Sequence, residues 1–277
     1  MKKISQLSLI AMLVLIAACS PSKKPQEATE ELKLPKVEGK EISYSADSLT
    51  MNGYIAYDAN VEGKRPGILV VHEWWGHNDY ARERADMLAE LGYVALAVDM
   101  YGDGKLAEHP EDAGTFMMEV ISNIDGAKVR FESAMETLKA NENVDADKIG
   151  AIGYCFGGSV VLSMANAGYD LDAVTAFHGG VGLPIWPEVG GVKGKVLVCN
   201  GADDPFITSE SVTKYKNKMD SAGADYRYVS YEGAVHSFTS KGADEIAKKF
   251  PQMPVAYNAA ADSASWDEMK KLFEESF

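Results

Sequence analysis

A cysteine lies within a glycine frame of the kind that presents a catalytic nucleophile. Residues 153–157 are Gly-Tyr-Cys-Phe-Gly, with Cys155 at the centre, and they follow an apolar run over residues 148–152. Such a frame places the nucleophile on a sharp strand-to-helix turn, where flanking glycines avoid collisions with the neighbouring strand and helix. The small, apolar residues 159–167 predict a buried helix, whose N-terminus favours a thiolate. A nucleophilic Cys155 is therefore predicted, with a buried, inert cysteine in a tight turn as the alternative.

Two residue types that a cysteine nucleophile needs follow it along the chain. Asp204 lies in Gly-Ala-Asp-Asp-Pro-Phe, directly after an apolar strand pattern, and His236 follows the next strand pattern. A nucleophile, an acid and a histidine in this order, each after a strand, are expected of a triad on a parallel sheet. Alone, Asp204 would suit a turn before proline and His236 a surface loop. Together with Cys155 they predict a triad, with Asp203 as the second choice of acid.

The chemistry follows from these residue types. An unperturbed thiol is mostly protonated at neutral pH, so His236 is expected to take the proton of Cys155 while Asp204 fixes the imidazole tautomer. Attack of the thiolate on a carbonyl carbon creates an oxyanion, which backbone N–H groups can stabilise. We expect these donors to be the amides of Phe156, which follows the nucleophile, and of Trp74, which follows an earlier strand.

Strand and helix patterns alternate along the chain from residue 41. Continuous apolar runs indicate buried strands, and 3.6-residue periodicity indicates helices. The expected strands cover residues 41–45, 51–56, 66–72, 93–98, 148–152, 173–177, 195–200 and 226–231, and the expected helices cover residues 79–91, 125–140, 209–222 and most of 257–277. Asn52 and Gly53 are expected to contribute turn or bulge chemistry to the opening hairpin. The pattern predicts one α/β domain over residues 41–277, with a mostly parallel central sheet and helices on both faces.

The N-terminus has the pattern of an exported lipoprotein. Lys2 and Lys3 precede an apolar run too short to span a bilayer, so residues 1–18 are predicted to be a signal peptide. The run ends Leu-Ile-Ala-Ala-Cys, which resembles the bacterial lipobox and makes Cys19 the expected lipidation site; an ordinary cleaved secretory signal is the alternative. Residues 19–40 are predicted to be a flexible tether. The expected location is the cell envelope, at the outer membrane or the periplasmic face.

Composition disfavours several classes of partner and cofactor. The 277-residue chain has 46% apolar and 25% charged residues, as soluble globular domains do, and a formal net charge of −14. That charge disfavours nucleic acid and anionic membrane surfaces, so membrane contact is expected only through the lipid anchor. Cys199 is expected to lie in the core, apart from Cys155. Neither a metal-ligand spacing nor a nucleotide-binding glycine pattern is found, so we predict no metal and no cofactor.

The motifs together resemble those of the dienelactone hydrolases, bacterial α/β-hydrolases with a Cys-Asp-His triad. The likeness runs from about residue 66 to the C-terminal helix and rests on His-Glu-Trp-Trp-Gly at 72–76, Gly-Tyr-Cys-Phe-Gly-Gly at 153–158, Gly-Ala-Asp-Asp-Pro-Phe at 201–206 and His-Ser-Phe at 236–238. It implies an α/β-hydrolase fold and cleavage of small esters or lactones. It also matches Glu73 to the family's glutamate, which takes the thiol proton when substrate displaces it from an arginine. A salt-bridged loop carboxylate is the alternative for Glu73.

Two features of that family are missing from this sequence. In dienelactone hydrolases, arginines hold the substrate's free carboxylate, one on the helix after the third core strand and one shortly after the catalytic histidine. Residues 111–124 contain no Arg or Lys, and Ser240 stands where the second arginine is expected. This disfavours dienelactone itself as the substrate and predicts a more apolar pocket. The side chains expected to contact substrate are Trp75, Tyr101, His178 and Ser237.

The sequence thus predicts a lipid-anchored hydrolase that cleaves small ester, lactone or thioester bonds through an acyl-cysteine on Cys155. The missing arginines leave a second hypothesis, a non-catalytic cell-envelope binding protein that retains the hydrolase fold. A redox role for Cys155 is a third, and the lack of a nearby resolving cysteine in the sequence disfavours it.

Overall fold

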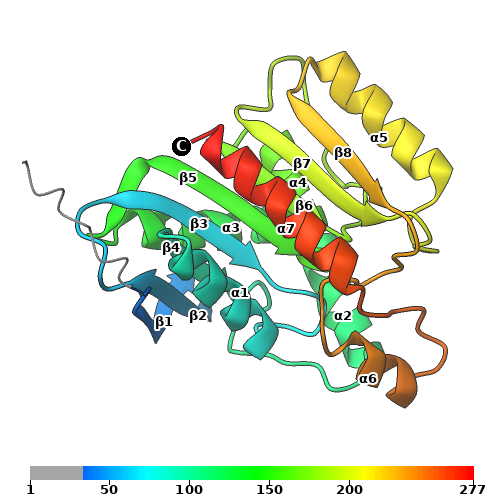
Figure 1. Cartoon of the computed structure of the whole chain (residues 1–277), viewed down its shortest axis with the longest axis horizontal. Coiled ribbons are helices and arrows are strands. Elements are labelled where there is room, and N and C mark those ends of the chain that lie inside the picture. The colour runs from blue at the N-terminus through cyan, green and yellow to red at the C-terminus, as the bar shows by residue number, and fades with distance from the viewer. Residues whose placement is uncertain (1–33) are drawn as a thin grey trace, which may run out of the picture. The chain divides into compact units, whose positions relative to one another are not determined.

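An eight-stranded, mostly parallel sheet is the centre of the fold (Figure 1). The computed structural model describes residues 34–277, which pack as one compact unit. In the sheet the strand order is β1-β2-β4-β3-β5-β6-β7-β8. The strands are β1 (Val37–Ala46), β2 (Leu49–Asp58), β3 (Arg65–Val71), β4 (Val94–Val98), β5 (Val144–Tyr154), β6 (Ala173–Phe177), β7 (Lys195–Gly201) and β8 (Tyr226–Tyr231). Only the β1–β2 and β2–β4 pairs are antiparallel, which confirms the predicted α/β architecture.

Helices cover both faces of this sheet (Figure 1). They are α1 (Asp79–Glu90), α2 (Pro110–Ile121), α3 (Ile124–Lys139), α4 (Phe156–Asn166), α5 (Ser209–Ala222), α6 (Ala243–Lys249) and α7 (Ala259–Glu274). Successive strand side chains point to opposite faces. Leu69 of β3 therefore joins the core under α3, α4 and α5, while Ile68 joins the core under α1 and α7. Each such fully buried aliphatic side chain contributes about 2 kcal/mol to folding before entropy is counted.

The opening hairpin differs from the sequence prediction. β1 begins at Val37, so residues 37–40, expected in the tether, pair with β2 instead. The turn lies at residues 47 and 48, where Asp47 has a φ of 52°, while Asn52 and Gly53 lie within β2 and form no turn. Asp tolerates this left-handed conformation better than most residues. The predicted signal peptide, Cys19 and the tether up to residue 33 lie outside the described residues.

The residues predicted for the active site follow carboxyl ends of parallel strands, which meet at one edge of the sheet. Loops after β3, β5, β6 and β7 carry Glu73, Cys155, His178 and Asp204, respectively. The loop after β8, residues 232–240, carries His236 and is called the histidine loop below. A bridge between His236 and Val255 draws the segment after α6 to the same edge.

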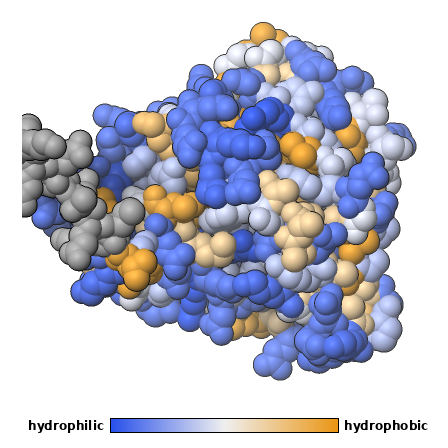
Figure 2. All heavy atoms as spheres, in the orientation of Figure 1, coloured by the Kyte–Doolittle hydropathy of each residue, from blue (hydrophilic) through white to orange (hydrophobic). Residues whose placement is uncertain are grey.

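The described surface is largely polar. On the face in Figure 2, apolar residues are scattered among hydrophilic ones. Large apolar side chains that are exposed come from separate elements: Leu34, Val61, Leu91, Leu106, Met118, Val189 and Phe206. Among residues 34–277, no helix combines the length and the apolar character that crossing a membrane requires.

Candidate active site

Cys155 occupies a strained turn between β5 and α4. Its φ of 53° and ψ of −115° lie outside the regions that non-glycine residues favour. Two hydrogen bonds hold the turn: Cys155 N–H donates to Phe177 O at 3.0 Å, and Gly157 N–H donates to His72 O at 3.1 Å. A Cβ atom on Gly157 would overlap the backbone carbonyl of Val71. Glycine is required there because β3 passes so close to the start of α4.

The structure brings Cys155, His236 and Asp204 into one hydrogen-bonded row. His236 Nε2 lies 3.1 Å from Cys155 Sγ, and His236 Nδ1 lies 2.7 Å from Asp204 Oδ2. Asp204 is buried, and its second oxygen accepts the Phe206 N–H at 2.9 Å. Asp203, the second choice of acid, has an exposed side chain and is not the acid of this row. The sheet therefore brings together Cys155, Asp204 and His236, the three residues that were predicted as a triad from their order along the chain.

The charge on His236 is set by its two partners. Burial lowers the pKa of His236, but the Cys155 sulfur and the Asp204 carboxylate outweigh that effect and raise it to about 10. A neutral imidazole at Nε2 accepts the thiol proton, and the resulting imidazolium is stabilised by the carboxylate at Nδ1. The row therefore places His236 Nε2 where it can accept the thiol proton of Cys155.

Glu73 is a buried carboxylate beside this row. Only 3% of its surface is exposed, and its Oε1 accepts the Ser237 hydroxyl at 3.1 Å. Burial raises the pKa of Glu73, although the charges of His236 and Arg84 and the Ser237 hydrogen bond oppose the shift. Cys155 Sγ hydrogen bonds to His236, with no hydrogen bond to Glu73 among the described residues. Glu73 therefore acts on the loop that carries His236, through Ser237.

The two predicted oxyanion donors both border the cleft at Cys155. Neither the Phe156 N–H nor the Trp74 N–H has a hydrogen-bond acceptor within the part of the chain that the structure describes. The Tyr101 hydroxyl donates to Trp74 O at 2.8 Å and fixes the loop after β3. Burial raises the pKa of Tyr101, which keeps this hydroxyl protonated as a donor. Both amides are therefore free to face a ligand's oxygen.

The cleft itself is apolar. It has a volume of about 520 Å³ and opens over Cys155 and His236. Its polar lining consists of Cys155, His236, Ser159, Ser237 and Gln252. None of its lining side chains is Lys or Arg. The remaining walls are Trp74, Met117, Ile121, Phe156, Gly180, Pro205, Phe206, Met253, Pro254 and Val255. Such a site would hold a small, uncharged molecule.

Of the four side chains predicted to contact substrate, Ser237 alone lines this cleft. Trp75 stacks on Phe250 and lines a separate cavity of about 420 Å³. Tyr101 is buried beneath the Trp74 loop. The predicted contacts of these two are not found in this cleft, because Trp75 lines the other cavity and the Tyr101 hydroxyl is used on the backbone of Trp74.

His178 is the third side chain whose predicted contact is not found. It is fully buried, its Nε2 lies 2.7 Å from Thr239 Oγ1, and its ring packs edge-on against His236 at 5.3 Å. Burial, together with the charges of His236 and Arg84, holds the pKa of His178 well below its ordinary value of 6.5. A neutral His178 packs against the histidine loop through Thr239 and His236 and adds no charge to the row of Cys155, His236 and Asp204.

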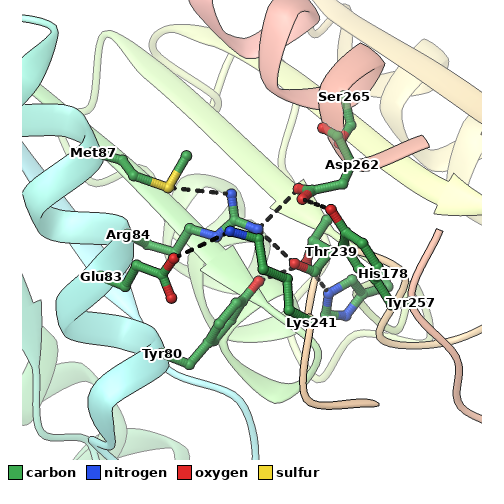
Figure 3. Close-up of polar contacts among 10 residues, drawn as sticks. All are labelled: Tyr80, Glu83, Arg84, Met87, His178, Thr239, Lys241, Tyr257, Asp262 and Ser265. Carbon is green, nitrogen blue, oxygen red and sulfur yellow. Dashed lines mark hydrogen bonds and ion pairs between the residues drawn. The ribbon is translucent and has the colours of Figure 1, made fainter. Parts of the chain in front are cut away.

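Arg84 of α1 anchors the same loop, a role that the sequence analysis missed (Figure 3). Its Nη2 donates to Thr239 O at 2.6 Å and to Asp262 Oδ1 of α7 at 2.9 Å. Tyr80 Oη, also from α1, lies 2.6 Å from Thr239 Oγ1. Two helices and the histidine loop are thus joined by one buried guanidinium. A signal was present, because Arg84 falls on the apolar face defined by Ala81 and Leu88.

A further wall of the cleft was also missed. Residues 252–255, Gln-Met-Pro-Val, follow α6 without helical or strand periodicity and reach the cleft through the bridge at His236. Pro205 and Phe206, next to the triad acid, form the wall beside them. A loop position of this kind gives no periodic signal, so only its apolar composition could have suggested a binding role.

A model of the dienelactone hydrolase family matches residues 51–277. This chain belongs to the dienelactone hydrolase family. Among solved structures, a dienelactone hydrolase-like promiscuous phosphotriesterase from metagenomic libraries is 34% identical, with a TM-score of 0.80, and the match covers 87% of this chain and 99% of that one. The protein m3DLH is 37% identical, with a TM-score of 0.82 and the same coverage.

Curated relatives agree with this membership. Protein usf of Aquifex pyrophilus is 29% identical over 215 residues, which cover 75% of this chain and 90% of the relative. A putative carboxymethylenebutenolidase of Aquifex aeolicus is 26% identical with the same coverage. As a dienelactone hydrolase family member, the chain has the α/β-hydrolase fold and is a carboxylic ester hydrolase, as the sequence predicted.

The structure locates the positions where this family member lacks arginines. The helix after β4 is α2, which contributes Met117 and Ile121 to the cleft and no cation. Ser240 is buried and lines the separate cavity that also contacts Glu73. The cleft therefore has no guanidinium from either position with which to bind a substrate carboxylate.

Proposed function

We propose that this protein hydrolyses small, uncharged carboxylic esters and lactones through an acyl-cysteine intermediate on Cys155. The observation that carries the proposal is the row from Cys155 Sγ to His236 Nε2 at 3.1 Å and from His236 Nδ1 to Asp204 Oδ2 at 2.7 Å. Distances of this size permit proton transfer along the row. Thioesters contain the same reactive carbonyl and belong to the same proposed range.

Acylation begins when His236 Nε2 takes the thiol proton and the Cys155 sulfur attacks the carbonyl carbon. A new carbon–sulfur bond forms, and the carbonyl electron pair moves onto oxygen, facing the N–H groups of Phe156 and Trp74. The electron pair on that oxygen then re-forms the carbonyl double bond, the bond from carbon to the leaving oxygen breaks, and His236 gives its proton to the leaving oxygen. For a lactone, the leaving alcohol stays attached to the acyl group.

Deacylation uses the same residues with water as the nucleophile. His236 removes one proton from the water, whose oxygen bonds to the thioester carbon. The carbon–sulfur bond breaks, the carboxylic acid leaves, and the proton on His236 is again shared with Cys155. Asp204 keeps Nδ1 protonated throughout, so that Nε2 is the nitrogen that exchanges the proton.

Glu73 is assigned a positioning role rather than direct proton transfer. The family resemblance would have Glu73 receive the thiol proton after release from an arginine, but Ser240 stands at that arginine's position and Ser237 is the hydrogen-bond donor to Glu73. We infer that His236 receives the proton, while Glu73 holds Ser237 and hence the adjoining His236 in register.

The first test is acylation of the purified protein with p-nitrophenyl acetate, followed by intact-protein mass spectrometry and nitrophenol release. A gain of one acetyl group on Cys155 with turnover is expected. Cys155→Ala should abolish both, whereas Cys199→Ala, which removes the buried free thiol, should change neither. Wild-type turnover in the Cys155→Ala variant would refute the proposal.

The preference for uncharged substrates has its own test. A dicarboxylic half-ester, which carries a free carboxylate, is compared with its uncharged diester. The diester should have the higher kcat/KM, by about tenfold or more, because burying an unpaired carboxylate in an apolar cleft is costly. Equal values would contradict the substrate class and leave the nucleophile unaffected.

We also propose that the protein is a cell-envelope lipoprotein acylated at Cys19 and tethered through residues 20–33, because Leu34 and Lys36 of the predicted tether already hydrogen bond to the domain. The support is the order of the N-terminal sequence, from the two lysines through the apolar run to Ala-Ala-Cys. Metabolic labelling with an alkyne fatty acid should mark the wild type and leave Cys19→Ala unlabelled. Labelling of the variant, or none of the wild type, would refute lipidation.

A further inference from the structure

A second apolar cavity adjoins the cleft on the side of α2 and α4. It has a volume of about 80 Å³ and shares three lining residues with the cleft: Ile121, Phe156 and Ser159. Behind them it is enclosed by Ile124 and Ala127 of α3 and by Val160 and Met164 of α4, and Gly182 forms its rim. The cavity therefore lies directly beyond the residue that follows the nucleophile.

The two serines that line this cavity both donate their hydroxyl hydrogens to backbone carbonyls, so neither offers a ligand a free donor. The Ser159 hydroxyl donates to Gly180 O at 2.9 Å, and the Ser163 hydroxyl donates to Ser159 O at 2.7 Å. None of the lining side chains is charged. Apolar cavities of about 150 Å³ hold one benzene ring, so this one accommodates roughly half as many carbons, about three. Its chemistry suits a short alkyl chain.

The position of His236 indicates which part of an ester enters. The leaving oxygen must lie near His236 Nε2 to receive its proton, so the alcohol occupies the side of the cleft formed by Phe206 and residues 252–255. The small cavity shares none of those residues and lies against α2 and α4 instead. A group that enters this cavity therefore lies on the side of the carbonyl carbon opposite the alcohol. That group is the acyl chain.

We propose that this cavity is an acyl side pocket that selects esters of short, unbranched acids of about four carbons. The proposal rests on the hydrolysis proposed above and names the acyl class of its substrates. Burial of each added methylene should raise kcat/KM about fourfold until the pocket is full. From acetate to butyrate, two added methylenes, the rise is about fifteenfold, and longer chains gain nothing more or lose activity.

The test uses p-nitrophenyl esters from acetate to decanoate and, separately, acetates of alcohols of increasing length. Ala127→Val and Val160→Leu are chosen to fill the pocket, because both residues are buried, line it and do not line the cleft. Ile124→Ala enlarges the pocket without changing the cleft lining. Gly114→Leu is the control, because a Cβ there meets no atom within 4 Å and the residue lines neither cavity.

We expect the butyrate preference of the wild type to vanish in both filled variants, to shift to longer acids in Ile124→Ala, and to persist in Gly114→Leu. An unchanged acyl profile in both filled variants, with Cys155-dependent activity intact, would overturn the side pocket and leave the proposed hydrolysis standing. A changed alcohol profile with an unchanged acyl profile would overturn the acyl assignment. Failure of the wild type to hydrolyse any ester would refute the hydrolysis itself.

Discussion

Replacement of Arg84 by methionine tests how the histidine loop is held. The Arg84 side chain is almost fully buried, and its Nη2 donates to Thr239 O and to the Asp262 carboxylate. The guanidinium also lies over the rings of Tyr154 and Trp266. Methionine retains much of the apolar volume but removes both of these hydrogen bonds. It leaves Asp262, whose side chain is 13% exposed, as a nearly buried charge without its cation.

The expected magnitude follows from that burial. Removing one partner of a buried ion pair costs about 3–5 kcal/mol, because the other charge stays desolvated. For a domain of this size, 1 kcal/mol corresponds to about 2–4 °C, so Tm should fall by roughly 6–20 °C. Adding Asp262→Asn removes the orphaned charge, so the double variant should be at least about 1 kcal/mol more stable than Arg84→Met alone.

Urea denaturation of the two single variants and the double variant gives these free energies, and ester hydrolysis gives kcat and KM. A displaced histidine loop should lower kcat more than it raises KM, because Thr239 lies three residues from His236. The control is Arg82→Met on the same helix, whose exposed pair with Glu41 should be worth less than about 1 kcal/mol. A loss below about 1 kcal/mol for Arg84→Met, or strictly additive losses with Asp262→Asn, would refute this reasoning.

Three further predictions concern the site. Because burial raises the pKa of Glu73, folding stability falls as pH rises above about 4.5; urea unfolding should show Glu73→Gln more stable than wild type at pH 8, with a smaller difference at pH 5. Burial lowers the pKa of His236 and its partners raise it, so removal of the sulfur in Cys155→Ala should drop that pKa well below 10 in ¹⁵N NMR of the ring. Gly157→Ala should cost about 2 kcal/mol or more in urea unfolding, because its Cβ overlaps a backbone carbonyl, whereas Gly114→Ala, in open space on α2, should be neutral or stabilising.

The fold followed from sequence wherever an element is buried on a regular face. β3, β4, β6 and β7 are almost entirely buried, so continuous apolar runs marked them. β1 is an edge strand with mostly exposed side chains, and its first residues, Val-Glu-Gly-Lys, have the composition of a tether. α2 was not predicted as a helix, because only Ala113 and Val120 of its residues are buried, and Met117 and Ile121 line cavities instead.

The site was predictable where residue type and chain order carry the information. Cys155, Asp204 and His236, which the structure brings together, could be proposed from sequence because their chemistry is distinctive and each follows a strand. Sequence position alone did not distinguish the neighbours Trp74 and Trp75, which line different cavities. That distinction depends on the direction of each side chain from an irregular loop, and no periodicity encodes it.

Support of the histidine and selection of the substrate are physically separate in this protein. Arg84 contacts the histidine loop from the side of α1 and α7, where its charge is paired with Asp262 and shielded by aromatic rings. Ser240, at the position of a family arginine, adds no charge to the cleft. The loop is therefore held by a cation that no substrate touches, and the cleft stays free to bind apolar groups. Substitutions in the part of α2 and α4 that lines the proposed acyl pocket should thus change which acyl chains are preferred without displacing His236. Substitutions at Arg84 should displace His236 and leave the acyl preference unchanged.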